Sequence, residues 1–105
     1  IITGGENVWP ETVEAALSTH PDVADVLVRG VFDPQWGEIV VAAVVPVSGA
    51  APTLDELRTH VKETNPAYMA PKHIDLVEAL PRTSLGKLQR GQPADPATPA
   101  PPSIT

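Results

Sequence analysis

The amino-acid sequence predicts an α+β domain with a small, mainly antiparallel sheet and flanking helices. Three observations support this class. Two segments repeat apolar residues at helical spacing, and each begins with a helix-start signal. Two β-branched, apolar segments separated by a short turn lie between them, as in an antiparallel hairpin. Shorter strand-like segments come before and after, so the predicted order is strand, helix, strand, strand, helix, strand.

The first predicted elements are a short strand over residues 1–3, a turn at Gly4-Gly5 and a helix that begins at Pro10. Proline suits the first helical position, because its missing N–H has no helical partner there. Apolar residues then recur at helical spacing and predict a buried face: Val13, Ala16 and Leu17. We expect the helix to end at the proline that follows His20.

The central hairpin is predicted from residues 23–32 (VADVLVRGVF) and residues 38–45 (EIVVAAVV). Both segments are rich in β-branched residues. The intervening residues 33–37 (DPQWG) contain Pro and Gly and predict a turn. Because residues 38–45 are almost continuously apolar, we expect this strand to be covered on both faces.

The second helix is predicted to begin at a capping box formed by Thr53 and Glu56. An apolar stripe follows, made of Leu54, Leu57 and Val61. Asn65-Pro66 stops this helix, and residues 67–71 form a short connector. A final strand is predicted from partly alternating apolar residues, namely Ile74, Leu76 and Leu80.

The chain is expected to contain one domain, over residues 1–90, followed by a disordered tail over residues 91–105. The tail holds five of the 13 prolines, a single charge and no hydrophobic period. Such a segment buries too little apolar surface to offset its ordering entropy. Because the chain opens with Ile1 rather than Met, at the start of a predicted strand, we expect it to be part of a longer protein.

The composition excludes several classes of function. Seven Lys and Arg stand against 13 Asp and Glu, giving a net charge of −6, which argues against nucleic-acid binding. The absence of cysteine excludes disulfides and thiolate metal sites. No apolar run is long enough to predict a membrane span, and no signal segment opens the chain. The simplest interpretation is a cytoplasmic protein.

Common catalytic motifs are missing as well. The sequence has no G-x-S-x-G elbow, and its three histidines are scattered: His20, His60 and His73. No metal site is predicted. Gly86-Lys87 follows a segment (PRTSL) that lacks the first glycine of a phosphate-binding loop. The residues alone therefore do not predict an enzyme that acts by itself.

Two segments carry a resemblance to a known family. Residues 1–14 (IITGGENVWPETVE) and residues 80–90 (LPRTSLGKLQR) resemble the last two motifs of the adenylate-forming, or AMP-binding, superfamily. The segments between these two motifs also resemble those of the family, in the same order. The resemblance therefore covers residues 1–90, which correspond to the small C-terminal domain. Within the superfamily, the sequence is most similar to the acyl- and aryl-CoA synthetases. This resemblance implies that the complete protein activates a carboxylic acid with ATP to an acyl-adenylate and then transfers the acyl group to CoA. The small domain is expected to rotate between these two steps.

The resemblance implies that Lys87 is the catalytic residue of the first step. A mobile ammonium group docked in a dry cleft would stabilise the charge that builds up as carboxylate and α-phosphate meet. Gly86 would let the backbone pass close to the nucleotide, and Arg90 would support the loop or contact phosphate. The alternatives are a solvated lysine at position 87 and an exposed salt bridge at position 90. The resemblance also makes Lys87 a candidate for regulatory acetylation, which removes the charge.

CoA binding is expected at the opposite face, where Gly4-Gly5-Glu6-Asn7 resembles the segment lining the tunnel for the pantetheine arm. A narrow tunnel favours residues without a Cβ atom. Trp9 is a further candidate, beside the CoA nucleotide. The alternatives are that the glycines simply make a turn and that Trp9 packs on the first helix; Trp36 and Tyr68 are expected to be structural.

The resemblance assigns the remaining parts of the reaction to a large N-terminal domain, which would be the partner of this one. That domain would bind most of the ATP, the Mg2+ ion and the acid, so residues 1–105 alone are expected to be inactive. The acid is expected to be a medium- or long-chain fatty acid or an aryl acid such as o-succinylbenzoate, as in menaquinone synthesis.

Two other assignments remain open at this point. One is the adenylation domain of a peptide synthetase, although residues 91–105 show no serine-bearing carrier segment. The other is a non-catalytic α+β interaction module that happens to contain Gly86-Lys87. A test of acid-dependent ATP–pyrophosphate exchange in the complete protein separates the module from both enzymes.

Overall fold

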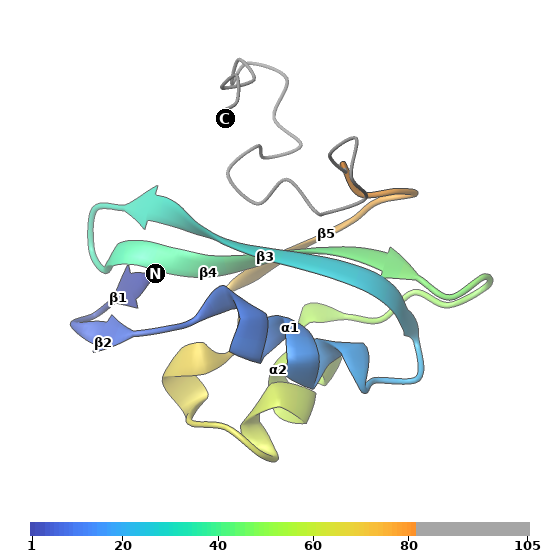
Figure 1. Ribbon diagram of the computed structural model, residues 1–105, viewed down its shortest axis with the longest axis horizontal. Helices are drawn as coiled ribbons and strands as arrows, with labels where there is room; N and C mark the ends of the chain where they lie inside the picture. Colours follow the sequence, from blue (N-terminus) through green and yellow to red (C-terminus); the bar gives the residue numbers. More distant parts are fainter. Residues whose placement is uncertain (82–105) are drawn as a thin grey trace.

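The computed structural model describes residues 1–81, which form two layers (Figure 1). One layer is a five-stranded sheet, and the helices lie against one of its faces. The predicted class, α+β with a mainly antiparallel sheet and flanking helices, is confirmed. The strand order is β2-β1-β4-β3, and β5 pairs with β4 on the same side as β1.

The chain begins with a tight hairpin of β1 (Ile2–Thr3) and β2 (Glu6–Asn7), which pair antiparallel. Gly4 and Gly5 form its turn with φ values of 56° and 87°. Two consecutive positive φ values are what a two-residue hairpin turn demands, and they explain the glycine pair. No strand was predicted for residues 6–7, which pair with β1 as the second strand of this hairpin.

Helix α1 (Pro10–Ser18) begins at the predicted proline, with Trp9 as its N-cap residue. Val13 and Leu17 are fully buried against the sheet, which confirms the predicted buried face. The helix ends three residues before Pro21, close to the predicted end. This helix therefore covers the part of the sheet that lies above it in Figure 1.

Strands β3 (Val23–Asp33) and β4 (Gly37–Pro46) form the predicted central hairpin. They pair antiparallel, with Leu27 opposite Ala43. The turn between them is closed by the Asp33 carboxylate, which accepts hydrogen bonds from the backbone N–H groups of Gln35 (3.0 Å) and Trp36 (2.9 Å). Residues 40–44 are all buried, so β4 is covered on both faces as expected.

Strand β3 is an outer strand of the sheet, and acidic side chains occupy part of its free edge. Glu14 of α1 accepts a hydrogen bond from the Val28 N–H at 2.7 Å. Asp25 accepts one from the Val26 N–H at 2.9 Å. Helix α1 is thus joined to the sheet by a hydrogen bond as well as by apolar packing.

Helix α2 (Leu54–Lys62) has the predicted capping box. The Glu56 N–H donates to the Thr53 hydroxyl at 3.2 Å, and the Thr53 N–H donates to the Glu56 carboxylate at 2.9 Å. Two N–H groups that the first turn would otherwise leave without partners are thereby satisfied. Leu57 and Val61 are fully buried, as the apolar stripe predicted.

The end of the described region differs most from the prediction. The expected connector contains a short 3-10 helix, η1 (Ala67–Met69), and β5 (His73–Leu76) pairs with β4 in parallel, whereas the other strand pairs are antiparallel. Leu80, expected in this strand, lies beyond its end. The parallel pairing follows from the connection, because α2 and η1 carry the chain back across the sheet between β4 and β5.

The core lies between the sheet and the helices. Its buried members come from β3, β4, α1, α2, η1 and the residue that follows β2: Val8, Val13, Leu17, Val23, Val26, Val28, Val40, Ala42, Val44, Leu57, Val61, Met69 and Ala70. Within residues 1–81, no helix is long and apolar enough to cross a membrane.

Candidate functional site

The predicted site residues fall into two groups. Lys87, Gly86 and Arg90 lie outside the described residues, as does the predicted tail over residues 91–105. The CoA-binding candidates at residues 4–7 and Trp9 lie in and directly after the N-terminal hairpin. The site can therefore be built from the hairpin and its neighbours.

A cavity of about 260 Å³, here called the hairpin cavity, opens beside this hairpin. Its lining comes from the hairpin, the β3–β4 turn, α2, η1 and the residue before β5: Thr3, Gly4, Glu6, Trp36, Arg58, Ala67, Tyr68 and Lys72. It thus brings together residues that lie up to 69 positions apart in the sequence. Gly4 and Glu6 are the predicted residues that line it, whereas Gly5, Asn7 and Trp9 do not.

Gly4 and Trp36 are packed directly against each other in this cavity. The Gly4 N–H donates to the Trp36 carbonyl oxygen at 2.9 Å. A Cβ atom on Gly4 would lie only 2.9 Å from the Trp36 ring. Position 4 therefore requires glycine both for its positive φ and for the close approach of the indole ring.

Two cationic side chains stand at the hairpin cavity. The Lys72 ammonium lies 4.5 Å from the centre of the Trp36 ring, within the range of a cation–π contact. The Arg58 guanidinium donates to the Pro71 carbonyl oxygen at 2.7 Å, which fixes the arginine against the segment that carries Lys72. The lining contains two cationic side chains and one carboxylate, that of Glu6. This excess of positive charge favours a ligand that carries negative charge.

The lining residues differ in burial. Thr3 is only 4% exposed and Arg58 is half-buried, whereas the other six lining residues are exposed. Most of the cavity wall therefore faces solvent, where charged groups of a ligand keep part of their hydration.

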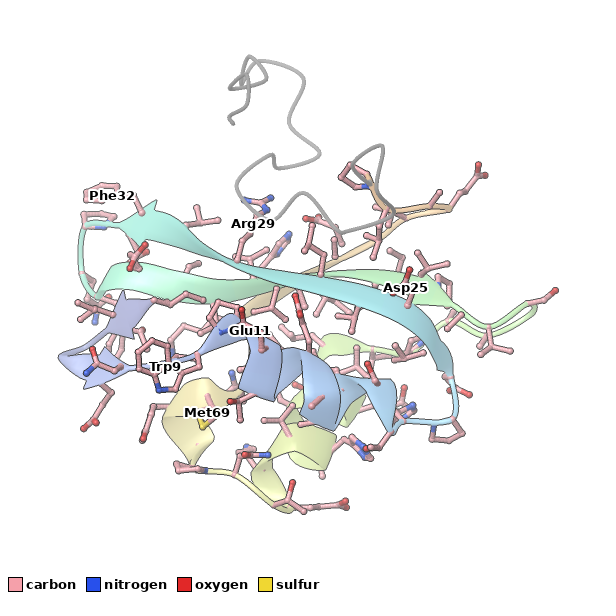
Figure 2. All side chains as sticks on the ribbon, viewed as in Figure 1. Trp9, Glu11, Asp25, Arg29, Phe32 and Met69 are labelled. Atoms are coloured by element: carbon pink, nitrogen blue, oxygen red, sulfur yellow. The ribbon has the colours of Figure 1, made fainter. Side chains whose placement is uncertain are left out.

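The other candidates of the opening segment lie near the cavity but outside its lining. Gly5 has a positive φ of 87° and nothing within 4 Å of a hypothetical Cβ atom, so the space beside it is open. Trp9 is 67% exposed at the start of α1 (Figure 2). Its expected packing on the first helix is therefore at most partial, and a role beside a nucleotide stays a prediction.

Sequence reasoning missed most of the cavity wall. Trp36 and Tyr68, expected to be structural, are each 41% exposed and line the cavity. Arg58 and Lys72 were not singled out. The sequence offered only a weak indication of their role, because it shows one basic residue in α2 and another directly after the connector over residues 67–71. Only the fold shows that these two residues lie at the same cavity.

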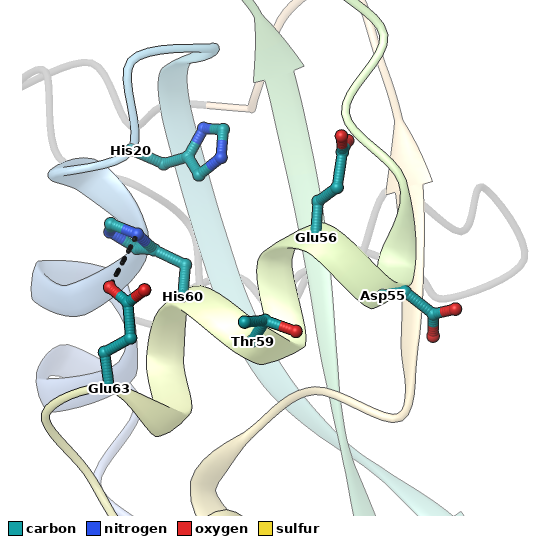
Figure 3. A pocket seen from close by; sticks show the side chains of 6 residues that line it. All are labelled: His20, Asp55, Glu56, Thr59, His60 and Glu63. Atoms are coloured by element: carbon teal, nitrogen blue, oxygen red, sulfur yellow. Dashed lines mark ion pairs between the residues drawn. The ribbon is translucent and has the colours of Figure 1, made fainter.

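Another hollow, of about 380 Å³, lies between the end of α1 and one side of α2 (Figure 3). Its lining contains two histidines, three carboxylates and one threonine: His20, Asp55, Glu56, Thr59, His60 and Glu63. The two imidazole rings meet edge to face, with centroids 5.0 Å apart. None of the predicted site residues lies there.

Hydrogen bonds within the fold already engage the polar groups of this second hollow. The Thr19 hydroxyl donates to the Ala16 carbonyl oxygen (2.7 Å), so it must accept from His60 Nε2–H, also at 2.7 Å. The other ring nitrogen of His60 faces Glu63 at 3.8 Å. His20 Nδ1 accepts the Asp22 N–H at 3.0 Å. These contacts join the ends of the two helices, and we assign this hollow a structural role.

Residues 1–81 contain no group of three or more side chains suited to hold a metal ion.

The contact between Gly4 and Trp36 gives a testable expectation. Gly4→Ala should lower the free energy of unfolding by about 2–3 kcal/mol, since it combines a left-handed alanine with displacement of the indole ring. Gly5→Ala is the matched control, because it also places alanine at a positive φ, which costs about 1–2 kcal/mol, but it meets open space. Urea unfolding of both variants checks this, and equal losses would contradict the proposed steric contact.

Comparison with known proteins gives the following matches. The model of the family described as AMP-binding enzyme C-terminal domain matches residues 12–87. A medium/long-chain-fatty-acid–CoA/3-oxocholest-4-en-26-oate–CoA ligase of Mycolicibacterium smegmatis is 48% identical over 87 residues, which are 83% of this chain and 16% of that protein. A probable 2-succinylbenzoate–CoA ligase of Mycobacterium tuberculosis is 47% identical over 91 residues, covering 86% of this chain and 24% of that protein.

Solved structures agree with these matches. The o-succinylbenzoate CoA synthetase of Bacillus subtilis, a double mutant bound with its product analogue, superposes with a TM-score of 0.83. The two sequences are 38% identical, and the match covers 90% of this chain and 19% of that chain. The chain thus spans at most 24% of the length of the relatives described.

Proposed function

The chain belongs to the AMP-binding enzyme C-terminal domain family, and on this premise we propose that it is the catalytic lid domain of an ATP-dependent acid–CoA ligase. The complete enzyme would convert a carboxylic acid, ATP and CoA into acyl-CoA, AMP and pyrophosphate. The observation that carries the CoA part of this proposal is the hairpin cavity, where a glycine turn, an indole ring and two cations converge.

The cavity suits CoA in both of its chemical parts. The phosphates of the nucleotide match the cationic side chains of Lys72 and Arg58. The pantetheine arm is thin and mostly uncharged, and it would pass along the hairpin turn, where Gly4 and Gly5 carry no side chain. Gly5, Glu6, Asn7 and Trp9 belong to the same proposed CoA surface around the hairpin.

Acid activation is assigned to Lys87, supported by its PRTSLGK setting. Its ammonium group would approach the reacting carboxylate and the α-phosphate of ATP and stabilise the charge that develops between them. Gly86 and Arg90 would support the loop. We propose that the partner of this domain is a large N-terminal domain of the same protein, which holds the acid, most of the ATP and the Mg2+ ion, and that the enzyme acts in the cytoplasm.

The acid is proposed to be a fatty acid or an aryl acid such as o-succinylbenzoate. Relatives of both kinds match this domain almost equally well, at 48% and 47% identity. Both relatives described are CoA ligases, which favours CoA as the acyl acceptor over the carrier domain of a peptide synthetase.

The proposal is tested on the complete enzyme by measuring acid-dependent ATP–pyrophosphate exchange and acyl-CoA formation separately. We expect Lys72→Ala to raise KM for CoA about threefold to tenfold, because a charge-assisted contact to phosphate is lost at an exposed position. Pyrophosphate exchange should be unchanged. Lys62→Ala, an exposed lysine at the end of α2, is the control for a general loss of positive charge.

Two results would contradict the proposal. One is the absence of any acid-dependent exchange in the unmutated enzyme with the candidate acids. The other is an equal KM for CoA in the Lys72→Ala and Lys62→Ala variants, which would remove the hairpin cavity from the CoA site.

A further inference from the structure

A carboxylate near the start of β4 reaches across to the first strand of the domain. Its residue is Glu38, whose Oε1 atom accepts a hydrogen bond from the Ile2 N–H of β1 at 2.8 Å. The two residues are 36 positions apart in the sequence. A side chain therefore joins the N-terminal hairpin of β1 and β2 to the larger hairpin of β3 and β4.

The pairing of β1 with β2 directs the Ile2 N–H group toward this carboxylate. At the open end of the N-terminal hairpin, the Ile1 nitrogen donates to the Val8 carbonyl oxygen at 3.0 Å. The Val8 N–H donates in return to the Ile1 carbonyl oxygen at 2.7 Å. In an antiparallel pair, the residue beside such a doubly bonded pair points its N–H group away from the partner strand. The Ile2 N–H therefore faces β4, where Glu38 meets it.

The backbone pairing between β1 and β4 is short. Within residues 1–81, these two strands pair at a single position, with Thr3 opposite Gly37. Continuing this antiparallel register by one residue would place Ile2 opposite Glu38. The side chain of Ile2 adds little packing, because it is 57% exposed. The Glu38 carboxylate therefore supplies the attachment at Ile2 that the short ladder does not.

Gly30 makes room for this carboxylate. The residue lies inside β3, where glycine weakens a strand and often marks a close approach. A Cβ atom at position 30 would lie 2.8 Å from Glu38 Oε2 and 3.0 Å from Cγ1 of Ile1. Its φ is not positive, so this close approach is what favours glycine there. We call Gly30, Glu38 and Ile2 the Glu38 clamp.

We propose that Glu38 is a positioning residue for the thioester-forming step, because it holds the N-terminal hairpin in one orientation on the sheet. The inference rests on the proposed function, in which this hairpin is part of the CoA surface. Glu38 itself is not in the lining of the hairpin cavity, so it acts through the hairpin. An isolated two-stranded hairpin is marginally stable at best, and its orientation depends on its attachments. Without the Glu38 clamp, only a fraction of the molecules would present the hairpin correctly, which lowers the apparent affinity for the ligand.

The test compares Glu38→Ala with Glu38→Gln in the complete enzyme. Both changes remove the charge, but glutamine keeps an oxygen atom that can accept from the Ile2 N–H. For Glu38→Ala we expect KM for CoA to rise about threefold to fivefold, as for the loss of one hydrogen bond. The kcat at saturating CoA and the acid-dependent pyrophosphate exchange should not change. Glu38→Gln should have a KM close to that of the unmutated enzyme.

Amide hydrogen exchange reports on the hairpin without the use of CoA. In Glu38→Ala, the peptide that covers residues 1–9 should exchange its amide hydrogens about threefold to fivefold faster, because the hairpin opens more often. Peptides from α2 and from the middle of β4 should be unchanged, and Glu38→Gln should keep the original rates. A residue with only a general structural role would instead affect all these peptides and lower pyrophosphate exchange together with acyl-CoA formation.

The inference is overturned if Glu38→Ala leaves KM for CoA unchanged, whether or not residues 1–9 exchange their amide hydrogens faster. It is also overturned if Glu38→Gln behaves like Glu38→Ala, since the effect would then come from the charge and not from the hydrogen bond. A failure of the proposed function is distinguishable, because the unmutated enzyme would then form no acyl-CoA. Hydrogen exchange would still show in that case whether Glu38 holds the hairpin.

Discussion

Lys87→Ala in the complete enzyme should lower acid-dependent ATP–pyrophosphate exchange by about 100-fold to 1000-fold, the usual cost of losing one preorganised group that stabilises transition-state charge. The carboxylate and the α-phosphate both carry negative charge, and alanine supplies nothing to offset it as they meet. Thioester formation from synthetic acyl-adenylate and CoA should be largely unaffected, because that step is proposed to use the hairpin face. Comparing the two half-reactions in one variant is therefore the decisive measurement.

Two further variants sharpen this test. Lys62→Ala removes an exposed lysine from α2 and should leave both half-reactions intact. Lys87→Arg keeps the charge but changes its shape and reach, so it should recover only part of the exchange rate. Equal losses in both half-reactions would indicate a folding defect or a general docking role, and unchanged exchange in Lys87→Ala would remove Lys87 from the reaction.

Leu57→Ala should lower the free energy of unfolding by about 2–5 kcal/mol, as for other large-to-small changes at fully buried leucines. Leu57 is 0% exposed and belongs to the core between α2 and the sheet. Alanine favours helix, so the loss would come from the cavity and not from helix propensity. Urea unfolding followed by circular dichroism measures the change.

Leu76→Ala is the matched control, because it deletes the same atoms from a side chain that is 46% exposed. Its loss should stay below about 1 kcal/mol, as is usual for changes away from the core. A loss at position 57 no larger than this would show that α2 is not packed on the sheet as described.

The elements that depend on near neighbours could be predicted from the sequence. The capping box needs only Thr53 and Glu56, three residues apart, and the start of α1 needs only Pro10. The β3–β4 hairpin follows from two apolar segments on either side of a turn closed by Asp33. In each case the determining contacts lie within a few residues, so the sequence contains them directly.

The features that depend on distant contacts could not be predicted. Strand β5 is parallel because of the path that α2 and η1 take between β4 and β5. The strand over residues 6–7 was missed for another reason: its pairing with β1 is local, but two polar residues give no apolar strand pattern. The convergence of Thr3, Trp36 and Lys72 on one cavity depends on how the hairpin, the turn and the connector pack together. The assignment of Lys87 rests on a motif and stays a prediction, since the residue lies outside the described range.

The acidic side chains along β3 also affect how this domain behaves toward other molecules. An outer strand offers its backbone to any free strand nearby, and this is a common beginning of aggregation. Here the Glu14 and Asp25 carboxylates already hold the Val28 and Val26 N–H groups. An incoming strand would have to break both hydrogen bonds and desolvate the two carboxylates. This edge of the sheet is thereby guarded against growth by self-association.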